Sequence, residues 1–300
     1  MAAQAIQPLR GRLLHNEPMA RHTTWRVGGT ADNYYQPADV TDLAGFLAQL
    51  PQDEPLFWLG LGSNLLVRDG GIRGTVIATS GMLNEMVRTD ENHVQVESGV
   101  SCAKVARFCA REGLAGAEFL CGIPGTMGGA LAMNAGCFGG ETWRLVESVE
   151  MMDREGRRKS HSAAEFDFGY RHVSGPSGEW FVSVTLRLQK GDAQGLLEAN
   201  KKLLEKRGAT QPTQQPNAGS VFRNPEGDYA ARLIESAGLK GLRIGNAEVS
   251  HKHANFIVNI GGASASDIEA LIEKVRFEVK RQHGIELQRE VHIVGEVDHG

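Results

Sequence analysis

The chain carries the stretch GIPGTMGGALAMNAG at residues 122–136, and this stretch decides how the sequence is interpreted. It lies inside the uncharged run 119–140, which holds seven glycines and one proline. A lipid-exposed helix does not tolerate that density of helix-breaking residues. The run therefore predicts a buried loop system, with a short helix beginning near Thr126, and not a membrane span.

A second glycine loop, Gly60-Leu61-Gly62-Ser63-Asn64-Leu65, follows a predicted buried strand at 56–59. It is not a dinucleotide fingerprint, because Leu65 stands where the third glycine would be, and the longer loop lacks the Gly-Lys-Ser/Thr of a P-loop. Glycines still let several main-chain N–H groups converge on a phosphate. Ordinary tight turns are the alternative for either loop alone. Two such loops in one chain favour a diphosphate that is bound and not cleaved, such as that of a dinucleotide cofactor.

The composition is that of a globular protein of two or three domains, with 300 residues of which 41% are hydrophobic. Lys and Arg number 32 against 36 Asp and Glu, and the net charge of −4 argues against a nucleic-acid-coating protein. The N-terminus has no apolar signal segment, and the four cysteines form no C-x-x-C pair. We therefore expect a cytoplasmic protein with no metal site, no membrane insertion and no nucleic-acid partner.

Helix and strand patterns alternate along the chain with hairpins, which favours an α+β fold over a doubly wound sheet. A capping box is predicted at Ser266 and Glu269, and Ser101 is predicted to cap the helix that follows it. A Pro- and Gln-rich segment at 211–219 predicts a linker or an ordered loop. The predicted helices are 40–50, 102–112, 191–207, 229–238 and 266–283. The predicted strands are 56–59, 71–78, 93–98, 145–153, 157–161, 180–189, 255–260 and 285–294.

Several polar residues could carry chemistry, although each also has an ordinary structural explanation. Ser220 follows Gly219 but is not a hydrolase nucleophile elbow, because Phe222 occupies the last glycine position, so a turn serine is the alternative. Glu290 has the opposite parity to Ile285, Leu287, Val291 and Ile293, and so points away from the core face. Such a residue is either a solvated glutamate or part of a cleft.

Two histidines, His251 and His253, flank Lys252 and could share one strand face. They lack a third ligand nearby, so a polar surface or substrate contact is favoured over a metal site. Arg171, after Tyr170, is by itself an ordinary surface arginine.

The motifs GLGSNLLV, GIPGTMGGALAMNAG, Tyr170-Arg171, AGSVFRNP and REVHIVGE occur in order over most of the chain. Together they resemble the family of UDP-N-acetylenolpyruvoylglucosamine reductases, also called UDP-N-acetylmuramate dehydrogenases. The resemblance implies non-covalently bound FAD, NADPH as co-substrate and a sugar-nucleotide substrate in peptidoglycan precursor synthesis. It also implies a two-part FAD-binding module of the vanillyl-alcohol-oxidase type plus an α+β substrate domain. We expect these parts at 1–82, 83–192 and 193–300.

The same resemblance assigns roles to individual residues. Arg171 would polarise the substrate, Ser220 would donate a proton, and Glu290 would be the glutamate of the last strand. Substrate contacts would come from Tyr170, Arg223, Asn224 and His253. The cofactor would be held by residues of the two glycine loops, namely Gly60, Gly62, Ser63, Asn64, Leu65, Gly122, Ile123, Pro124, Gly125, Thr126, Gly128, Gly129, Asn134, Ala135 and Gly136.

One departure from the family's longer form is clear in the sequence. Only residues 172–179 separate Arg171 from Trp180, so the insert that carries a lid tyrosine is absent and the chain resembles the short form. A flavin oxidase of the wider superfamily, needing no NADPH, is the rival enzyme. A nucleotide-sensing module is the non-enzymatic alternative.

Overall fold

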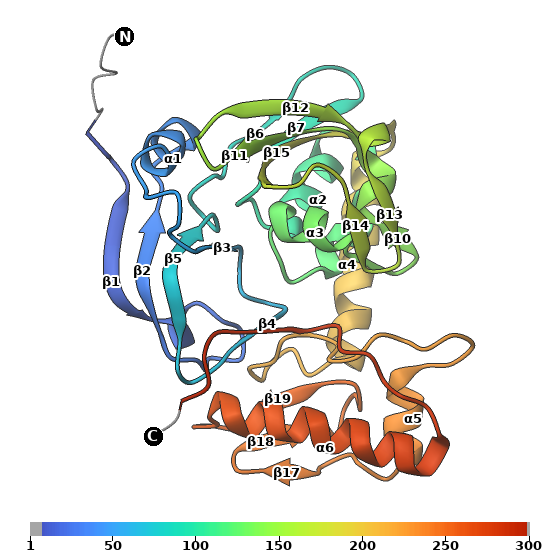
Figure 1. The fold of residues 1–300 in the computed structure, drawn as a ribbon. Helices are drawn as coiled ribbons and strands as arrows, with labels where there is room; N and C mark the ends of the chain where they lie inside the picture. Colours follow the sequence, from blue (N-terminus) through green and yellow to red (C-terminus); the bar gives the residue numbers. More distant parts are fainter. Residues whose placement is uncertain (1–7, 299–300) are drawn as a thin grey trace. The chain divides into compact units, whose positions relative to one another are not determined.

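The computed structural model describes residues 8–298, which form two compact units. The first unit comprises the residues up to Leu14, Asn33–Gly60 and Gly74–Leu204. The second comprises His15–Asp32, Leu61–Arg73 and the residues from Glu205 onward. The mixture of helices with mostly antiparallel strands is α+β, as predicted (Figure 1).

The first unit is built on a five-stranded antiparallel sheet in the order β12-β11-β15-β7-β6. The predicted hairpin is present, with Met152 opposite Arg158 beside its turn. The strands are β6 (Met86–Arg88), β7 (His93–Glu97), β11 (Val146–Asp153), β12 (Arg158–Ser162) and β15 (Glu179–Arg187).

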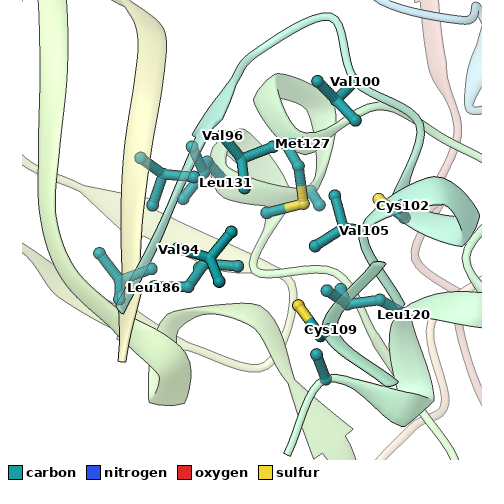
Figure 2. Packing of buried hydrophobic residues seen from close by; sticks show 14 of the residues in the cluster. Val94, Val96, Val100, Cys102, Val105, Cys109, Leu120, Met127, Leu131 and Leu186 are labelled. Carbon is teal, nitrogen blue, oxygen red and sulfur yellow. The ribbon is translucent and has the colours of Figure 1, made fainter. Parts of the chain in front are cut away.

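Helices α2 (Cys102–Arg111) and α3 (Met127–Met133) share a core with this sheet. Val94 and Val96 alternate with exposed Gln95 along β7, so one face of the strand is apolar. Figure 2 shows how the apolar side chains gather between the strands and the two helices. Ser101 caps α2 as predicted, and Thr126 caps α3 through a 3.5 Å contact from the N–H of Gly129. This packing fixes where the longer glycine loop begins its helix.

A four-stranded sheet has the order β1-β2-β5-β3, and β3 runs parallel to β5. Its strands are β1 (Arg12–Pro18), β2 (Thr30–Gln36), β3 (Leu56–Leu59) and β5 (Ile72–Ala78). Helix α1 (Val40–Leu47) begins at the cap Asp39, and its Phe46 ring stacks on Tyr35 at 3.6 Å between centroids. The first glycine loop starts directly after β3, as the sequence predicts.

Short strand pairs complete the first unit. They are β8 (Leu114–Ala115) with β16 (Gln189–Lys190), β9 (Gly136–Cys137) with β10 (Gly140–Glu141), and β13 (Asp167–Gly169) with β14 (His172–Ser174). Single 3-10 turns of this unit lie at Glu118–Gly122, Thr142–Leu145 and Ala163–Glu165, and another lies in the second unit at Met19–Arg21. Helix α4 (Ala193–Thr210) confirms the polar helix predicted at 191–207.

The second unit packs α5 (Ala230–Ser236) and α6 (Ala265–His283) with the antiparallel sheet β17-β18-β19 (Figure 1). The sheet strands are β17 (Arg243–Ile244), β18 (Ala247–Val249) and β19 (Ile257–Asn259). A separate parallel pair joins β4 (Leu65–Val67) to β20 (His292–Val294). Ile268, Ile272 and Val275 of α6 are buried at the predicted helical spacing.

Two local predictions are wrong. The capping box of α6 uses Ser264 and Asp267, whose reciprocal contacts measure 3.0 and 3.1 Å, and not Ser266 with Glu269. The same spacing occurs two residues earlier, and Ser266 instead donates its hydroxyl to Asp69 at 2.6 Å. The expected strand 285–294 is regular only at β20, because its earlier residues bond to the irregular segment 221–223. Within the described chain, none of the helices has the length and apolarity needed to cross a bilayer.

Candidate active site

A pocket of about 300 Å³ lies in the first unit beside both Gly60 and the first turn of α3. Its walls are mainly apolar, and the rings of Trp58 and Trp180 stack at 5.1 Å between centroids. The lining residues are Trp58, Leu59, Gly60, Thr79, Ser98, Gly128, Gly129, Ala132, Met151, Phe166, Val173, Gly175, Pro176, Glu179, Trp180 and Phe181. Such walls suit a flat ring system.

The glycines beside this pocket are needed because main chain and side chains approach very closely there. A Cβ on Gly60 would lie 2.5 Å from the hydroxyl oxygen of Thr126, and a Cβ on Gly128 would lie 2.9 Å from the Cβ of Ser98. The N–H of Gly128 also donates to the carbonyl oxygen of Ser98 at 2.8 Å. Side chains at these positions would separate the elements that form the pocket wall.

Tyr170 and Arg171 form the two-residue turn between β13 and β14, since Gly169 pairs with His172. Arg171 has a left-handed backbone, with φ +54°, and its guanidinium lies 5.3 Å from the Tyr170 ring centroid. The guanidinium also donates to the carbonyl oxygen of Gly136 at 3.1 Å. The end of the longer glycine loop therefore contacts the turn that carries the predicted substrate-polarising arginine.

In the second unit, Ser220 and Glu290 lie on neighbouring segments. The N–H of Glu290 donates to the carbonyl oxygen of Val221 at 2.8 Å, directly after Ser220. Leu287 and Val291 are buried as predicted, whereas Glu290 is only half-buried. Two residues that are 70 positions apart in the sequence are thereby brought close together.

The later part of the first glycine loop lies in this second unit as well. Gly62 has φ +66°, and a Cβ there would lie 2.2 Å from the carbonyl oxygen of His22, so the position requires glycine. Asn64 donates its side-chain amide to the carbonyl oxygen of Glu290 at 3.2 Å. Its own carbonyl oxygen accepts the N–H of His292 at 3.0 Å. The loop is thus joined to the strand of the predicted catalytic glutamate.

The comparisons with known proteins agree over nearly the whole chain. Residues 211–294 match the family model for the UDP-N-acetylenolpyruvoylglucosamine reductase C-terminal domain, and residues 31–161 match an FAD binding domain. The reductase of Alkalilimnicola ehrlichii is 61% identical over 98% of both chains. That of Methylococcus capsulatus is 58% identical over 98% of this chain and 97% of the relative. The chain belongs to the UDP-N-acetylenolpyruvoylglucosamine reductase family.

A solved structure supports the same assignment at the level of the fold. The crystal structure of the reductase from Thermus caldophilus has a TM-score of 0.80 and 33% identity, covering 95% of this chain and 99% of that one. Members of this reductase family are FAD-dependent oxidoreductases, and the FAD-binding domain with its C-terminal reductase domain confirms the predicted fold class. The predictions of an enzyme and of FAD are confirmed with it.

The pocket of this reductase family member has the chemistry that a flavin dinucleotide needs. The Ser98 hydroxyl and the Trp58 indole N–H are buried in the pocket wall and have no hydrogen-bond partner among residues 8–298. Buried donors without a partner are costly unless a ligand supplies an acceptor. Apolar walls with two such donors fit a ring bearing acceptor atoms, so the residues present fit the cofactor.

Asn255 holds the main chain next to Ser220, and the sequence did not single it out. Its side-chain oxygen accepts the N–H of Phe222 at 3.0 Å, and its side-chain nitrogen donates to the carbonyl oxygen of Phe222 at 2.8 Å. Its main-chain carbonyl oxygen accepts the N–H of Val221 at 2.9 Å. One buried amide thus holds the two residues that follow Ser220. In the sequence, the one feature that sets Asn255 apart is that it is a polar residue at the start of the apolar run 255–260.

The remaining predicted substrate residues lie in the second unit. Asn224 accepts the N–H of Ala230 at 3.1 Å at the start of α5, and the N–H of Arg223 donates to Gln288 at 2.9 Å. The expectation that His251 and His253 share a strand face is wrong, because both lie in the turn that precedes β19. That turn is stabilised by the Ser250 hydroxyl, which accepts the N–H of Lys252.

His253 packs its ring against Phe256 at 4.7 Å between centroids. Burial lowers the pKa of His253, and its Nδ1 accepts the N–H of Asn255 at 3.3 Å, which leaves Nε2 as the donor of the neutral ring. Groups of three or more possible metal-ligating side chains are absent from residues 8–298.

Proposed function

We propose that this protein reduces the enolpyruvyl group of UDP-N-acetylglucosamine enolpyruvate with NADPH, forming UDP-N-acetylmuramate in the cytoplasm for peptidoglycan synthesis. The observation that carries the proposal is the near-full-length match to relatives named as this reductase, combined with the pairing of the Ser220 and Glu290 segments. When bound, FAD would take hydride from NADPH and pass it to the terminal carbon of the enolpyruvyl group.

The two glycine loops would hold the cofactor. Main-chain N–H groups of these loops would bind the diphosphate, because glycines let successive N–H groups converge on an anion. The pocket lined by Trp58 and Trp180 would take a ring, with Ser98 as a hydrogen-bond donor. We also propose that residues 1–82 and 83–192 form the two parts of this module, and that 193–300 binds the sugar nucleotide.

Arg171 would bind the carboxylate of the enolpyruvyl group. Its guanidinium is permanently cationic and presents a planar pair of donors that matches a carboxylate. Withdrawal of charge toward this group makes the terminal carbon able to accept hydride, and the developing enolate is stabilised by the same contact. The turn at Tyr170 and Arg171 is fixed by strand pairing and by the guanidinium contact to Gly136. This supports the role, since the guanidinium must be oriented before the reaction.

Ser220 would then protonate the carbon next to the carboxylate. The enolate is strongly basic, so a serine hydroxyl can serve as the acid without a histidine or aspartate partner. Glu290 would contribute a hydrogen bond to the substrate when protonated. One hydride and one proton are added across the double bond, which balances the reduction. Arg223, Asn224 and His253 would contact the sugar nucleotide.

An anaerobic stopped-flow experiment tests this function. The purified protein should show a flavin spectrum that is bleached by NADPH and restored by UDP-N-acetylglucosamine enolpyruvate. Restoration only by oxygen would instead indicate a flavin oxidase. A colourless protein that binds nucleotides would contradict both enzymatic functions and support a sensing module.

A further inference from the structure

Asn134 is a buried residue at the end of α3, with 1% of its surface exposed. Its backbone is left-handed, with φ +42°, a conformation that asparagine tolerates better than most residues. Its side-chain oxygen accepts the N–H of Trp143 at 3.1 Å. Its side-chain nitrogen donates to the carbonyl oxygen of Gly169 at 3.0 Å and, more weakly, to the carboxylate of Glu141 at 3.5 Å. Both ends of the amide thus contact main-chain groups of the protein.

Gly169 is the residue at which the turn carrying Arg171 begins. Gly169 pairs with His172, so the main chain between them has only two residues in which to reverse direction. Arg171 lies at φ +54°, an unfavourable conformation for a residue with a long side chain, which persists only where the surroundings fix it. The amide of Asn134 fixes one end of this turn.

A second contact joins the same two segments. The guanidinium of Arg171 donates to the carbonyl oxygen of Gly136, two residues after Asn134. The side chain of Asn134 therefore holds the main chain of the turn, and the main chain at Gly136 receives the arginine head group. Both contacts originate in the stretch 134–136 of the longer glycine loop.

We propose that Asn134 is a positioning residue for Arg171, so that the loop predicted to bind the cofactor also sets the orientation of the group that polarises the substrate. The inference rests on the proposed role of Arg171. If Asn134 positions Arg171, its loss should slow the reoxidation of the flavin by substrate. A side chain that only binds the cofactor would affect flavin reduction by NADPH and flavin reoxidation alike.

The test uses Asn134→Asp and Asn134→Gly in the flavin-loaded full chain. Both variants tolerate the left-handed backbone and both remove the donor to Gly169. Asn134→Gly does so without placing a second carboxylate beside Glu141. Thr142→Val is the matched control, because the Thr142 hydroxyl donates to the carbonyl oxygen of Ala135 at 2.7 Å in the same loop without touching the turn. Stopped-flow absorbance measures flavin bleaching by NADPH and its reoxidation by UDP-N-acetylglucosamine enolpyruvate separately.

In flavin-loaded protein we expect both Asn134 variants to slow reoxidation by about 10- to 100-fold more than bleaching, as small misplacements of catalytic groups do. Thr142→Val should change the rates of bleaching and reoxidation by the same factor, because its hydrogen bond does not involve the turn that carries Arg171. In combination with Arg171→Lys, the Asn134 effects should be strongly non-additive, because both changes act through one guanidinium.

Additive effects, or equal slowing of bleaching and reoxidation in the Asn134 variants, would overturn the positioning role. Arg171→Lys by itself reports on the proposed function. If the Arg171→Lys variant were reoxidised as fast as the wild type, the proposed role of Arg171 would be wrong. If Arg171→Lys were reoxidised slowly while the Asn134 variants were reoxidised normally, only the inference about Asn134 would be wrong.

Discussion

The side-chain amide of Asn64 donates a hydrogen bond to the main-chain carbonyl oxygen of Glu290 over 3.2 Å. It extends the parallel ladder that begins one residue later, where Leu65 pairs with His292. A loop predicted from the sequence as a phosphate binder thus also fixes the main chain of the predicted catalytic glutamate. The two functions of this loop can be separated by experiment.

Asn64→Asp should weaken this connection while keeping the shape of the side chain. The donor to Glu290 is lost and two carbonyl-like oxygens face each other, so we expect the free energy of unfolding to fall by about 1–3 kcal/mol. Reoxidation by substrate should also slow more than bleaching by NADPH. Asn246→Asp is the control, because its amide contact to Gly262 is long and exposed. Equal stability of the two variants would contradict the prediction.

Ser220→Ala should separate the two halves of the catalytic cycle. Bleaching of the flavin by NADPH does not require an acid on the substrate side, so its rate should stay close to that of the wild type. Reoxidation should fall by about 10²- to 10⁴-fold, the usual contribution of a positioned proton donor. Ser236→Ala removes another hydroxyl of the same unit and serves as the control. Fast reoxidation in Ser220→Ala would exclude Ser220 as the acid.

Features encoded locally were predicted well, whereas features made by distant residues were not. The cap at Ser101 depends on a side chain and an N–H three residues away, so spacing alone reveals it. Even so, Ser264 and Ser266 offer two equally spaced capping boxes to α6, and only the contact of Ser266 with Asp69 decides between them. That contact spans 197 positions and leaves no local pattern.

The same distinction between locally encoded features and long-range contacts holds for the candidate site. The two glycine loops could be predicted as phosphate binders, whereas the close approach of Gly60 to Thr126 and of Gly128 to Ser98 is seen only in the folded chain. The amides of Asn255 and Asn134 act on main-chain groups 33 and 35 positions away, respectively. Nothing in the residues next to either asparagine specifies those partners. Roles that depend on such long-range contacts can therefore be recognised only in the folded structure.

Gly128→Ala should disturb the cofactor pocket. The new Cβ would lie 2.9 Å from the Cβ of Ser98, and the contact can be relieved only by moving α3 away from that residue. Overpacking of this kind costs about 1–3 kcal/mol, so both thermal stability and bound flavin per chain should fall. Gly208→Ala in α4 meets no atom within 4 Å and should leave flavin content unchanged. Full flavin loading in Gly128→Ala would exclude the expected displacement.

A pH-dependent contribution to stability should come from His161, whose neighbour Glu179 lines the pocket. Hydrogen bonds to Glu165 at 2.9 Å and Glu179 at 2.8 Å raise the pKa of His161. A raised pKa means that folding favours the protonated ring. The stabilisation is therefore complete below the unfolded value of about 6.5 and is lost as pH rises through the higher folded value.

The melting temperature of the His161→Gln variant should accordingly lie below that of the wild type at pH about 6 and approach it as the pH rises through the raised pKa of the folded state. Lys159 still pairs with Glu179 in the variant, so that carboxylate keeps one cationic partner. His251→Gln, at a side chain that is 73% exposed, is the control and should give only a small difference. A His161 effect that grew with rising pH would contradict the expected sign.

Arg171→Lys tests the geometry of the proposed substrate contact and not its charge. Lysine keeps the positive charge but offers a single flexible ammonium in place of a planar fork. It also loses the guanidinium contact to Gly136, so the cation is no longer held at the turn. We expect reoxidation by the enolpyruvyl substrate to slow by at least about 100-fold, with bleaching by NADPH unaffected. Arg144→Lys, an exposed arginine of the same unit, is the control and should match the wild type in both phases. A loss of only a few-fold in Arg171→Lys would mean that a cation suffices and that the fork does not polarise the carboxylate.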